Sequence, residues 1–161
     1  MSKMTLAAAT LCLVALSLRH VVVGQEPGDD FVKAHNAVRE KKGERPVFWD
    51  ELLEEHAKAY LQTKVETCEM VHSTDSPYGE NLATSNGDLT AEGAVAAWAA
   101  EEKYYDHKNN RCVGGECRHY VQLVWNATFL VGCATVKCRN TWTLVGCNYN
   151  PAGNIVGEEP Y

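Results

Sequence analysis

The chain has 161 residues, 45% of them hydrophobic, and a formal net charge of −6. This length suits one domain of ordinary size, and we do not expect a second hydrophobic core. The acidic balance argues against a nucleic-acid partner and against electrostatic adhesion to anionic membranes, because both depend on clustered Lys and Arg.

The first 24 residues have the pattern of a secretory signal peptide. Lys3 precedes an apolar run from Met4 to Leu18, and the small and β-branched residues 21–24 suit a signal peptidase, so we expect cleavage after Gly24. A retained anchor is the alternative, but the run is short for a bilayer span and no later segment could serve as a transmembrane anchor. The leader carries two positive charges, so residues 25–161 hold 13 Lys and Arg against 21 Asp and Glu, a formal charge of −8.

Three helices are predicted in the first two thirds of the chain. Asp29 and Asp30 can cap the first, which should end near Gly43. Asp50 can cap the second, whose apolar stripe runs to about Cys68. Residues 69–88 lose this periodicity and are rich in turn formers, which predicts an irregular loop. Helical spacing returns over residues 90–105.

The last third changes to strand-like patterns. Three runs of β-branched and aromatic residues predict strands at 120–125, 130–138 and 141–149, with a tight turn at Arg139-Asn140. Helices followed by strands indicate an α+β fold, in which helices cover both faces of an antiparallel sheet. Residues 151–161 are rich in Gly and Pro and should lie extended on the surface.

The cysteines indicate a disulfide framework. Cys12 lies in the leader, and an even number remains in the exported part: Cys68, Cys112, Cys117, Cys133, Cys138 and Cys147. Metal binding or free thiols are the alternatives, but no Cys-x-x-Cys pair occurs and exported proteins meet an oxidising environment. Six cysteines allow 15 pairings, and their spacing alone does not select one.

Common catalytic signatures are absent, including the His-Glu-x-x-His helix, the Gly-x-Ser-x-Gly elbow and Gly-rich phosphate loops. Four short strings stand out instead, in this order: HNAVR at 35–39, GENL at 79–82, HYVQLVW at 119–125 and CNYNPAGN at 147–154. Together they resemble the CAP superfamily (cysteine-rich secretory proteins, antigen 5 and pathogenesis-related proteins), and specifically plant pathogenesis-related class 1 proteins. The resemblance covers the whole of residues 25–161. One departure is Val121, where the family usually has threonine.

The resemblance implies an α-β-α sandwich with three disulfides. The pairs implied are Cys68–Cys138, Cys112–Cys117 and Cys133–Cys147. The glycines between Cys112 and Cys117 permit the sharp turn that a short bridge needs.

The resemblance also implies a cleft with two histidines and two acidic residues, at His72, Glu80, Glu101 and His119. Glu101 is preferred to its neighbour Glu102 because it shares a helix face with Trp98. Imidazole and carboxylate can bind a divalent metal such as zinc or act as an acid–base pair. Alternatively, the four groups hydrogen-bond one another and hold the loop against the sheet.

Three further features invite interpretation. On the first helix, His35, Asn36 and Arg39 are expected to make structural hydrogen bonds. Asn126-Ala127-Thr128 is a glycosylation sequon, with Asn126 as the acceptor. Residues 151–161 look like the signalling peptide that plant members of the family release, which makes Asn150 and Pro151 the candidate cleavage site for a protease.

The functions follow from the resemblance. The first is a secreted plant defence protein of the apoplast or vacuole, a monomer that needs no cofactor, is not an enzyme and withholds sterol or another lipid from pathogens. The family's sterol site maps to residues 104–117, which are largely polar here. The second is a precursor of a C-terminal defence peptide. The third is a metal-dependent hydrolase that uses the His/Glu cleft.

Overall fold

A computed structural model of the protein describes residues 28–139 and 141–161. The expected signal peptide and the Asn140 position of the predicted turn lie outside the described residues. Within the described part of the chain, no helix has the length and apolar character needed to cross a membrane.

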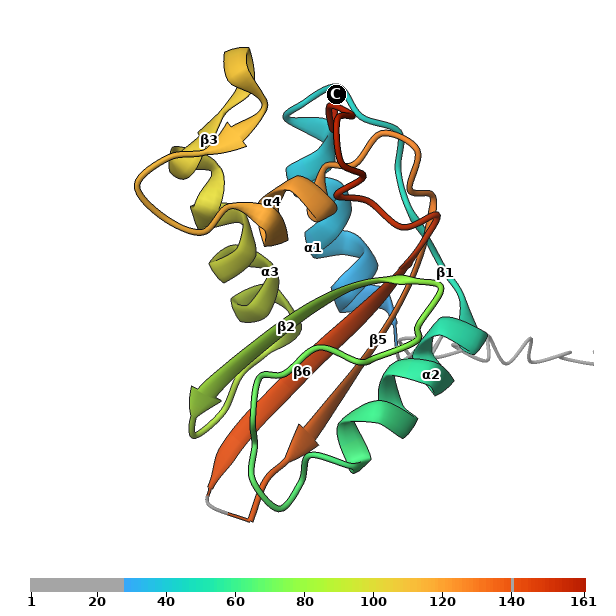
Figure 1. Ribbon diagram of the computed structural model, residues 1–161. Helices are drawn as coiled ribbons and strands as arrows, with labels where there is room; N and C mark the ends of the chain where they lie inside the picture. Colours follow the sequence, from blue (N-terminus) through green and yellow to red (C-terminus); the bar gives the residue numbers. More distant parts are fainter. Residues whose placement is uncertain (1–27, 140) are drawn as a thin grey trace, which may run out of the picture.

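A four-stranded sheet forms the centre of the fold, with strand order β1-β5-β6-β2 (Figure 1). Strand β6 (Trp142–Asn150) pairs antiparallel with both β5 (Leu130–Lys137) and β2 (Gly79–Asn86). The short strand β1 (Phe48–Trp49) adds a parallel edge to β5. The α+β class is confirmed, and the sheet is antiparallel except at this edge.

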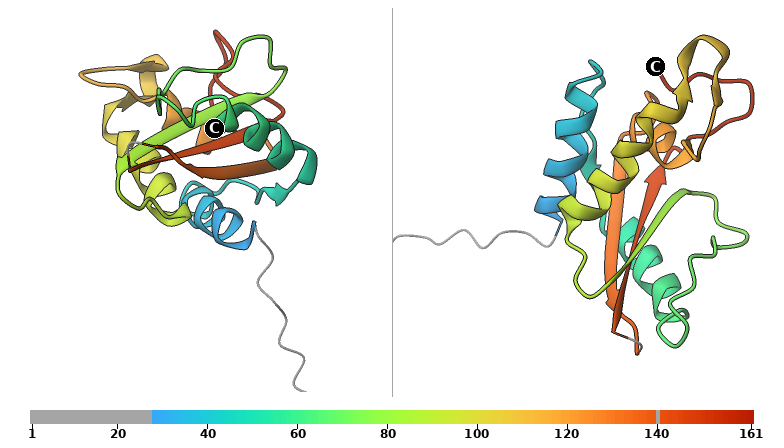
Figure 2. Two further views of the ribbon diagram at one scale, coloured as in Figure 1. Left: turned by 90° about the horizontal axis from the view of Figure 1, so that it is seen from below. Right: turned by 90° about the vertical axis from the view of Figure 1, so that its left-hand side faces the viewer.

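Helices cover both faces of the sheet, as the views in Figure 2 show. Helix α2 (Glu51–Gln62) packs on one face, where Ala134 and Val136 point. The other face, where Val131 and Cys133 point, meets α1 (Asp29–Glu40), α3 (Ala91–Ala99) and α4 (Arg118–Leu123). Alternation along each strand therefore supplies two cores, and the α-β-α sandwich is confirmed. Smaller elements join α3 to α4: the 3₁₀ helices η1 (Ala100–Tyr104) and η2 (His107–Asn109), and the paired strands β3 (Tyr105–Asp106) and β4 (Arg111–Cys112).

The structure pairs the six cysteines as the resemblance implies: Cys68–Cys138, Cys112–Cys117 and Cys133–Cys147. Cys133 and Cys147 lie directly opposite each other on β5 and β6. The first bridge joins the turns that follow α2 to the residue after β5, and the second closes the turn before α4.

The observed ends of helices α1 and α2 agree only partly with those predicted from the sequence. Asp50 caps α2 by accepting a hydrogen bond from Leu53 N at 2.9 Å, as predicted. Asp29 and Asp30 are not caps but lie in the first turn of α1, after Gly28, where acidic side chains complement the positive end of the helix dipole. Helix α2 ends at Gln62 and not near Cys68, because residues 63–67 form turns.

The predicted strand over residues 120–125 is wrong, since residues 118–123 form helix α4. Six consecutive residues, 120–125, are buried, so no alternation between buried and exposed positions distinguishes strand from helix. Val121 N donates to Cys117 O at 3.0 Å, which is a helical hydrogen bond. Burial of this segment on all sides therefore outweighs the low helix propensity of its β-branched residues.

Residues 69–88 are not wholly irregular, because strand β2 occupies 79–86. The strand is mostly polar and has few β-branched or aromatic residues, so strand propensity does not predict it. Pairing with β6 supplies the backbone partners, and Thr84 Oγ1 donates to Thr143 O at 3.0 Å. Leu82 and Ala83 are buried on opposite faces of the sheet. The sheet context, and not the local sequence, makes this segment a strand.

Residues 151–161 do not simply lie extended on the surface. Pro160 is buried, and the Tyr161 ring lies 4.9 Å from the His107 ring between centroids. Figure 1 shows this segment, in dark red, folding back over the upper end of the molecule. Its middle, residues 154–159, is exposed while its two ends contact the body.

Close packing of α2 on β5 leads to a stability prediction at Gly132. A Cβ at this position would lie 2.2 Å from Glu54 N and 2.6 Å from Asp50 O, which are backbone atoms of the α2 start. Gly132→Ala should therefore force α2 away from the sheet and lower the free energy of unfolding by about 2–3 kcal/mol. Urea denaturation measures this change.

Gly93→Ala is the matched control, because its Cβ would come no closer than 3.3 Å to Leu89 Cδ1 within α3. Alanine favours the helix, so this variant should be unchanged or up to about 1 kcal/mol more stable. Equal stabilities for the two variants would contradict the proposed backbone contact.

Candidate functional site

His72 and Glu80 form one hydrogen-bonded pair. Glu80 lies on β2, so pairing with β6 holds it in place, and its carboxylate accepts from His72 Nδ1 at 2.7 Å and from Ser73 N at 3.0 Å. The Glu80 side chain is 7% exposed and that of His72 is 59% exposed. A nearly buried carboxylate thus anchors an imidazole that reaches into solvent.

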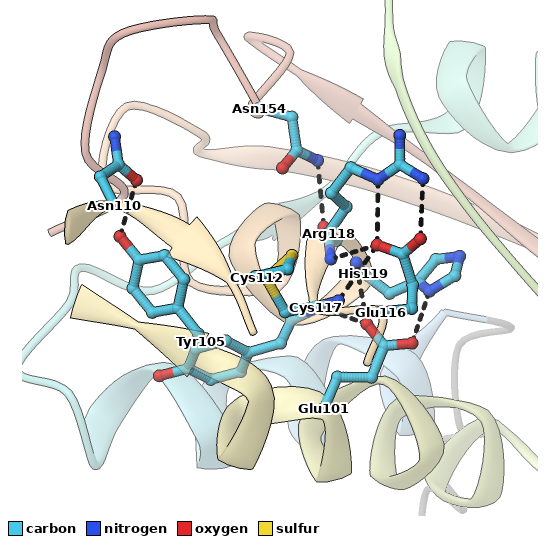
Figure 3. Close-up of a disulfide and its surroundings, with 10 residues drawn as sticks. Glu101, Tyr105, Asn110, Cys112, Glu116, Cys117, Arg118, His119 and Asn154 are labelled. Carbon is cyan, nitrogen blue, oxygen red and sulfur yellow. Dashed lines mark hydrogen bonds and ion pairs between the residues drawn. A yellow bond between two sulfur atoms is a disulfide. The ribbon is translucent and has the colours of Figure 1, made fainter. Parts of the chain in front are cut away.

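His119 and Glu101 form the second pair, seen in Figure 3. Glu101 on η1 accepts from His119 Nδ1 at 2.7 Å. Its other oxygen accepts from the backbone N of His119 at 3.1 Å and of Tyr120 at 3.3 Å, at the first turn of α4. Because the first N–H groups of a helix have no partner within it, Glu101 stabilises the start of α4 while it orients the imidazole.

The two pairs face each other across a cleft. The His72 and His119 rings are 6.4 Å apart between centroids, with 30° between their planes. The cleft has a volume of about 290 Å³, and His72, Glu80 and His119 line it together with residues 152–154. The structure therefore brings the four expected residues together, with Glu101 behind His119. Glu102, by contrast, pairs with Lys42.

Sequence reasoning missed the charged pair Glu116–Arg118 at the rim of this cleft. Arg118 donates to the Glu116 carboxylate from Nε at 2.9 Å and from Nη2 at 2.7 Å. This hydrogen-bonded guanidinium holds the pKa of Glu116 at about 2. Asn154 Nδ2 in turn donates to Arg118 O at 3.0 Å (Figure 3). Residues two apart in the sequence do not face each other on a helix, so the spacing of Glu116 and Arg118 gave no signal for the pair.

A buried network supports His119 from the core. Asn81 Nδ2 donates to His119 O at 3.0 Å and to Tyr149 Oη at 3.2 Å, and Tyr149 Oη lies 2.9 Å from His35 Nε2. Burial lowers the pKa of His35 to about 4 and raises the pKa of Tyr149 above its usual range. At neutral pH the network is therefore uncharged, and it links the backbone of His119 to buried residues of β2, β6 and α1.

The structural interpretation of the first helix agrees with the contacts observed. Asn36 donates to Val47 O at 3.0 Å and accepts from Val47 N at 2.8 Å, which holds the chain before β1. Arg39 is fully buried, and its guanidinium donates to main-chain carbonyls of four residues: Arg45, Leu123, Trp125 and Thr128.

The two His/Glu pairs contain the atom types that bind divalent metals. Both imidazoles give Nδ1 to a carboxylate, which is the arrangement that orients metal-binding histidines and leaves Nε2 free. Among the described residues, however, three potential ligand atoms lie within 4.8 Å of one another only at His35, Cys133 and Cys147, where the cysteines form a disulfide. The Nε2 atoms of His72 and His119 are thus two potential ligand atoms, whereas catalytic zinc sites use three protein ligands.

An apolar groove lies beside the cleft. It has a volume of about 300 Å³ and runs between the Cys112–Cys117 turn, α4 and residues 154–158. Tyr105, Val121, Trp125, Ile155 and Val156 line it, and the polar side chains of Arg111, Arg118 and Glu158 lie along it. Thus the region that looked too polar for a lipid gains its apolar surface from α4 and from the C-terminal segment.

A family model described as the cysteine-rich secretory protein family (CAP) matches residues 32–149. The chain belongs to this family.

Plant relatives and solved structures agree with CAP membership. The chain is 43% identical over 155 residues to the pathogenesis-related protein PR-1 type of Sambucus nigra, covering 95% of this chain and 93% of the relative. It is 40% identical over 151 residues to the basic form of pathogenesis-related protein 1 of Nicotiana tabacum, covering 93% and 85%. Its fold is similar to that of venom allergen-like protein 4 of Schistosoma mansoni, with 29% identity, a TM-score of 0.65 and coverage of 81% and 90%. The resemblance to plant pathogenesis-related class 1 proteins is confirmed, and the chain is a defence-related CAP protein.

The structure also shows where the glycosylation sequon and the candidate cleavage site lie, although it does not test either modification. Asn126 is exposed just after α4, while Thr128 of its sequon is buried and donates to Pro151 O at 2.8 Å. At the candidate cleavage site, Asn150 ends β6 and Pro151 is exposed. Glycosylation of Asn126 and cleavage before Pro151 stay predictions.

Proposed function

We propose that this protein is a secreted, non-catalytic defence protein of the apoplast or vacuole that binds a sterol or similar lipid in the groove between the Cys112–Cys117 turn, α4 and residues 154–158. The observation that carries the proposal is the apolar lining of this groove beside the exposed side chains of Ile155 and Val156. Valine at position 121, in place of the family's usual threonine, adds to that lining.

The size and chemistry of the groove suit one part of a sterol. Ligand sites are mainly apolar with a few polar groups that fix orientation, and 300 Å³ is at the lower end of their volumes. Tyr105 and Asn110 offer polar atoms at one side of the groove, where Tyr105 Oη donates to Asn110 Oδ1 at 2.9 Å. A rigid ligand would therefore enter in part and rest on the exposed apolar residues.

Titration with a fluorescent sterol, followed by fluorescence anisotropy, tests this proposal. The intact protein should bind saturably, and Ile155→Asp should weaken binding at least tenfold, because it places a charge where apolar surface is buried. Phe48→Asp is the matched control, since Phe48 is an exposed apolar residue on β1 that does not line the groove. Equal affinity for the two variants would overturn the assignment of the groove.

A divalent metal such as zinc is proposed as an accessory ligand and not as a cofactor that sterol binding requires. His72 and His119 would hold it through Nε2, and the metal would supply a charge that polarises bound water. Two nitrogen ligands support binding but fall short of a hydrolytic site. Sterol affinity should therefore be unchanged by a chelator, and a hydrolase role would require an activity that His119→Ala abolishes.

The second candidate function is that of a precursor whose residues 151–161 are released by a protease. Exposure of Pro151 and of residues 154–159 favours this role, because proteases need accessible chain. Signalling activity of a synthetic peptide of residues 151–161, without any lipid, would support it.

A further inference from the structure

The described residues that precede position 151, called the body below, form a binding site for residues 151–161. At the start of this segment, Pro151 O accepts from Thr128 Oγ1 at 2.8 Å. Gly153 N donates to Gln122 Oε1 at 2.8 Å, and Thr128 and Gln122 are both buried and hydrogen-bond each other at 3.2 Å. Two buried polar side chains are thus satisfied by the main chain of the segment, so removing the segment would leave them short of partners.

The far end of the segment is held just as closely. Pro160 is buried, and its carbonyl accepts from Asn126 N at 2.7 Å. Asn110 Nδ2 donates to Glu158 O at 2.7 Å. These two bonds use one main-chain and one side-chain donor of the body, so they fix the path of the segment across the groove.

Tyr161 is the anchor of this end. Its ring packs at 4.9 Å from His107 and 6.2 Å from Tyr105, measured between centroids. Its hydroxyl lies 3.0 Å from the Tyr120 hydroxyl, and His107 Nε2 donates to its backbone oxygen at 3.2 Å. Lys42 Nζ lies 5.9 Å from the ring centroid. Aromatic anchors in pockets of this kind dominate the energetics of interfaces.

From these contacts, we infer that residues 151–161 stay bound to the body after the chain is cut before Pro151, so that cleavage and release are separate steps. The body is then a peptide-binding site whose ligand is an aromatic-anchored segment of its own chain. Its biological meaning rests on the proposed precursor role. Cutting removes only the covalent link, which lowers the effective concentration of the segment but breaks none of these contacts.

The test uses the full chain with a site-specific protease sequence inserted between Asn150 and Pro151. After cutting, native mass spectrometry should find the segment still bound. Exchange against an excess of isotope-labelled synthetic peptide of residues 151–161 then gives its dissociation rate. Tyr161→Ala in the segment should raise this rate at least tenfold.

Val156→Ala is the matched control, because Val156 belongs to the same segment and is 100% exposed, so its side chain does not contribute to the anchor. Its dissociation rate should equal that of the unchanged segment. Loss of the segment on cutting, or equal rates for Tyr161→Ala and Val156→Ala, would overturn the inference. If no natural protease cuts before Pro151, the precursor role is wrong. Retention of the segment can still be measured, because the engineered cut is made in vitro.

A second measurement needs no insertion. In the uncut chain, Asn126 N is covered by Pro160 O. Hydrogen exchange at this amide should accelerate at least tenfold in Tyr161→Ala and stay unchanged in Val156→Ala. Unchanged exchange in both variants would show that Tyr161 anchors nothing.

Discussion

An Arg39→Leu variant should lose about 3–5 kcal/mol of its free energy of unfolding, because it removes the donor to several buried carbonyl groups at once. The guanidinium of Arg39 donates at 2.8 to 3.0 Å to the carbonyls of Arg45, Leu123, Trp125 and Thr128. It therefore joins α1 to the end of α4 and to the loop that precedes β5. Buried acceptors left without a donor each carry a desolvation penalty.

Arg39→Lys should recover only a small part of this loss. A lysine ammonium is a compact group and cannot reproduce the planar fork that reaches four carbonyls in different directions. Urea denaturation measures both variants.

Arg139→Ala is the control for removing a positive charge, because Arg139 is mostly exposed and its ion pair with Glu66 is at the surface. It should change stability by less than about 1 kcal/mol. A similar loss for Arg139→Ala and Arg39→Leu would show that the carbonyl contacts of Arg39 do not stabilise the fold.

His35 should make the protein lose about 3 kcal/mol of stability as the pH falls from 7 to 4. Burial lowers the pKa of the folded-state imidazole from 6.5 to about 4, so between these values the unfolded chain binds the proton and the folded chain does not. Its contribution is therefore fully present above pH 6.5, falls as the pH drops through the window, and is constant below about 4.

His35→Gln removes the titrating group. Between pH 7 and pH 4, the free energy of unfolding of this variant should therefore fall by about 3 kcal/mol less than that of the wild type. Tyr149→Phe is the control, since it removes the 2.9 Å contact to His35 Nε2 but keeps the imidazole buried. This control should keep the steep pH dependence. Urea denaturation at a series of pH values measures all three proteins, and parallel curves for His35→Gln and wild type would contradict the assignment.

The helices and strands with clear periodicity could be predicted from sequence. Helix α2 begins at its predicted cap, Asp50, and β5 and β6 lie within a residue of their predicted limits. These elements have one face on a core and a pattern that matches their period. Helix α4 and strand β2 could not be predicted this way, because the first is buried on all sides and the second is polar and takes its partners from β6.

The same division holds for the candidate site. Glu80 and His119 lie within short motifs, whereas His72 and Glu101 follow from the resemblance to the family, with Glu101 preferred to Glu102 for its helix face. Motifs do not contain the rim pair Glu116–Arg118 or the groove, since the groove draws its walls from α4, from the Cys112–Cys117 turn and from residues 154–158. Only the chain path brings these segments to one place.

The family, the α+β class, the pairing that the family implies for six cysteines and the identity of the cleft residues all follow from the sequence alone. Each of these depends on local patterns or on motifs that resemble a known family. By contrast, the helical state of residues 120–123 and the docking of residues 151–161 against the body depend on tertiary contacts. In both cases the deciding contacts join residues that are distant in the sequence, such as Tyr120 with Tyr161 and Gln122 with Gly153, and no local propensity encodes them.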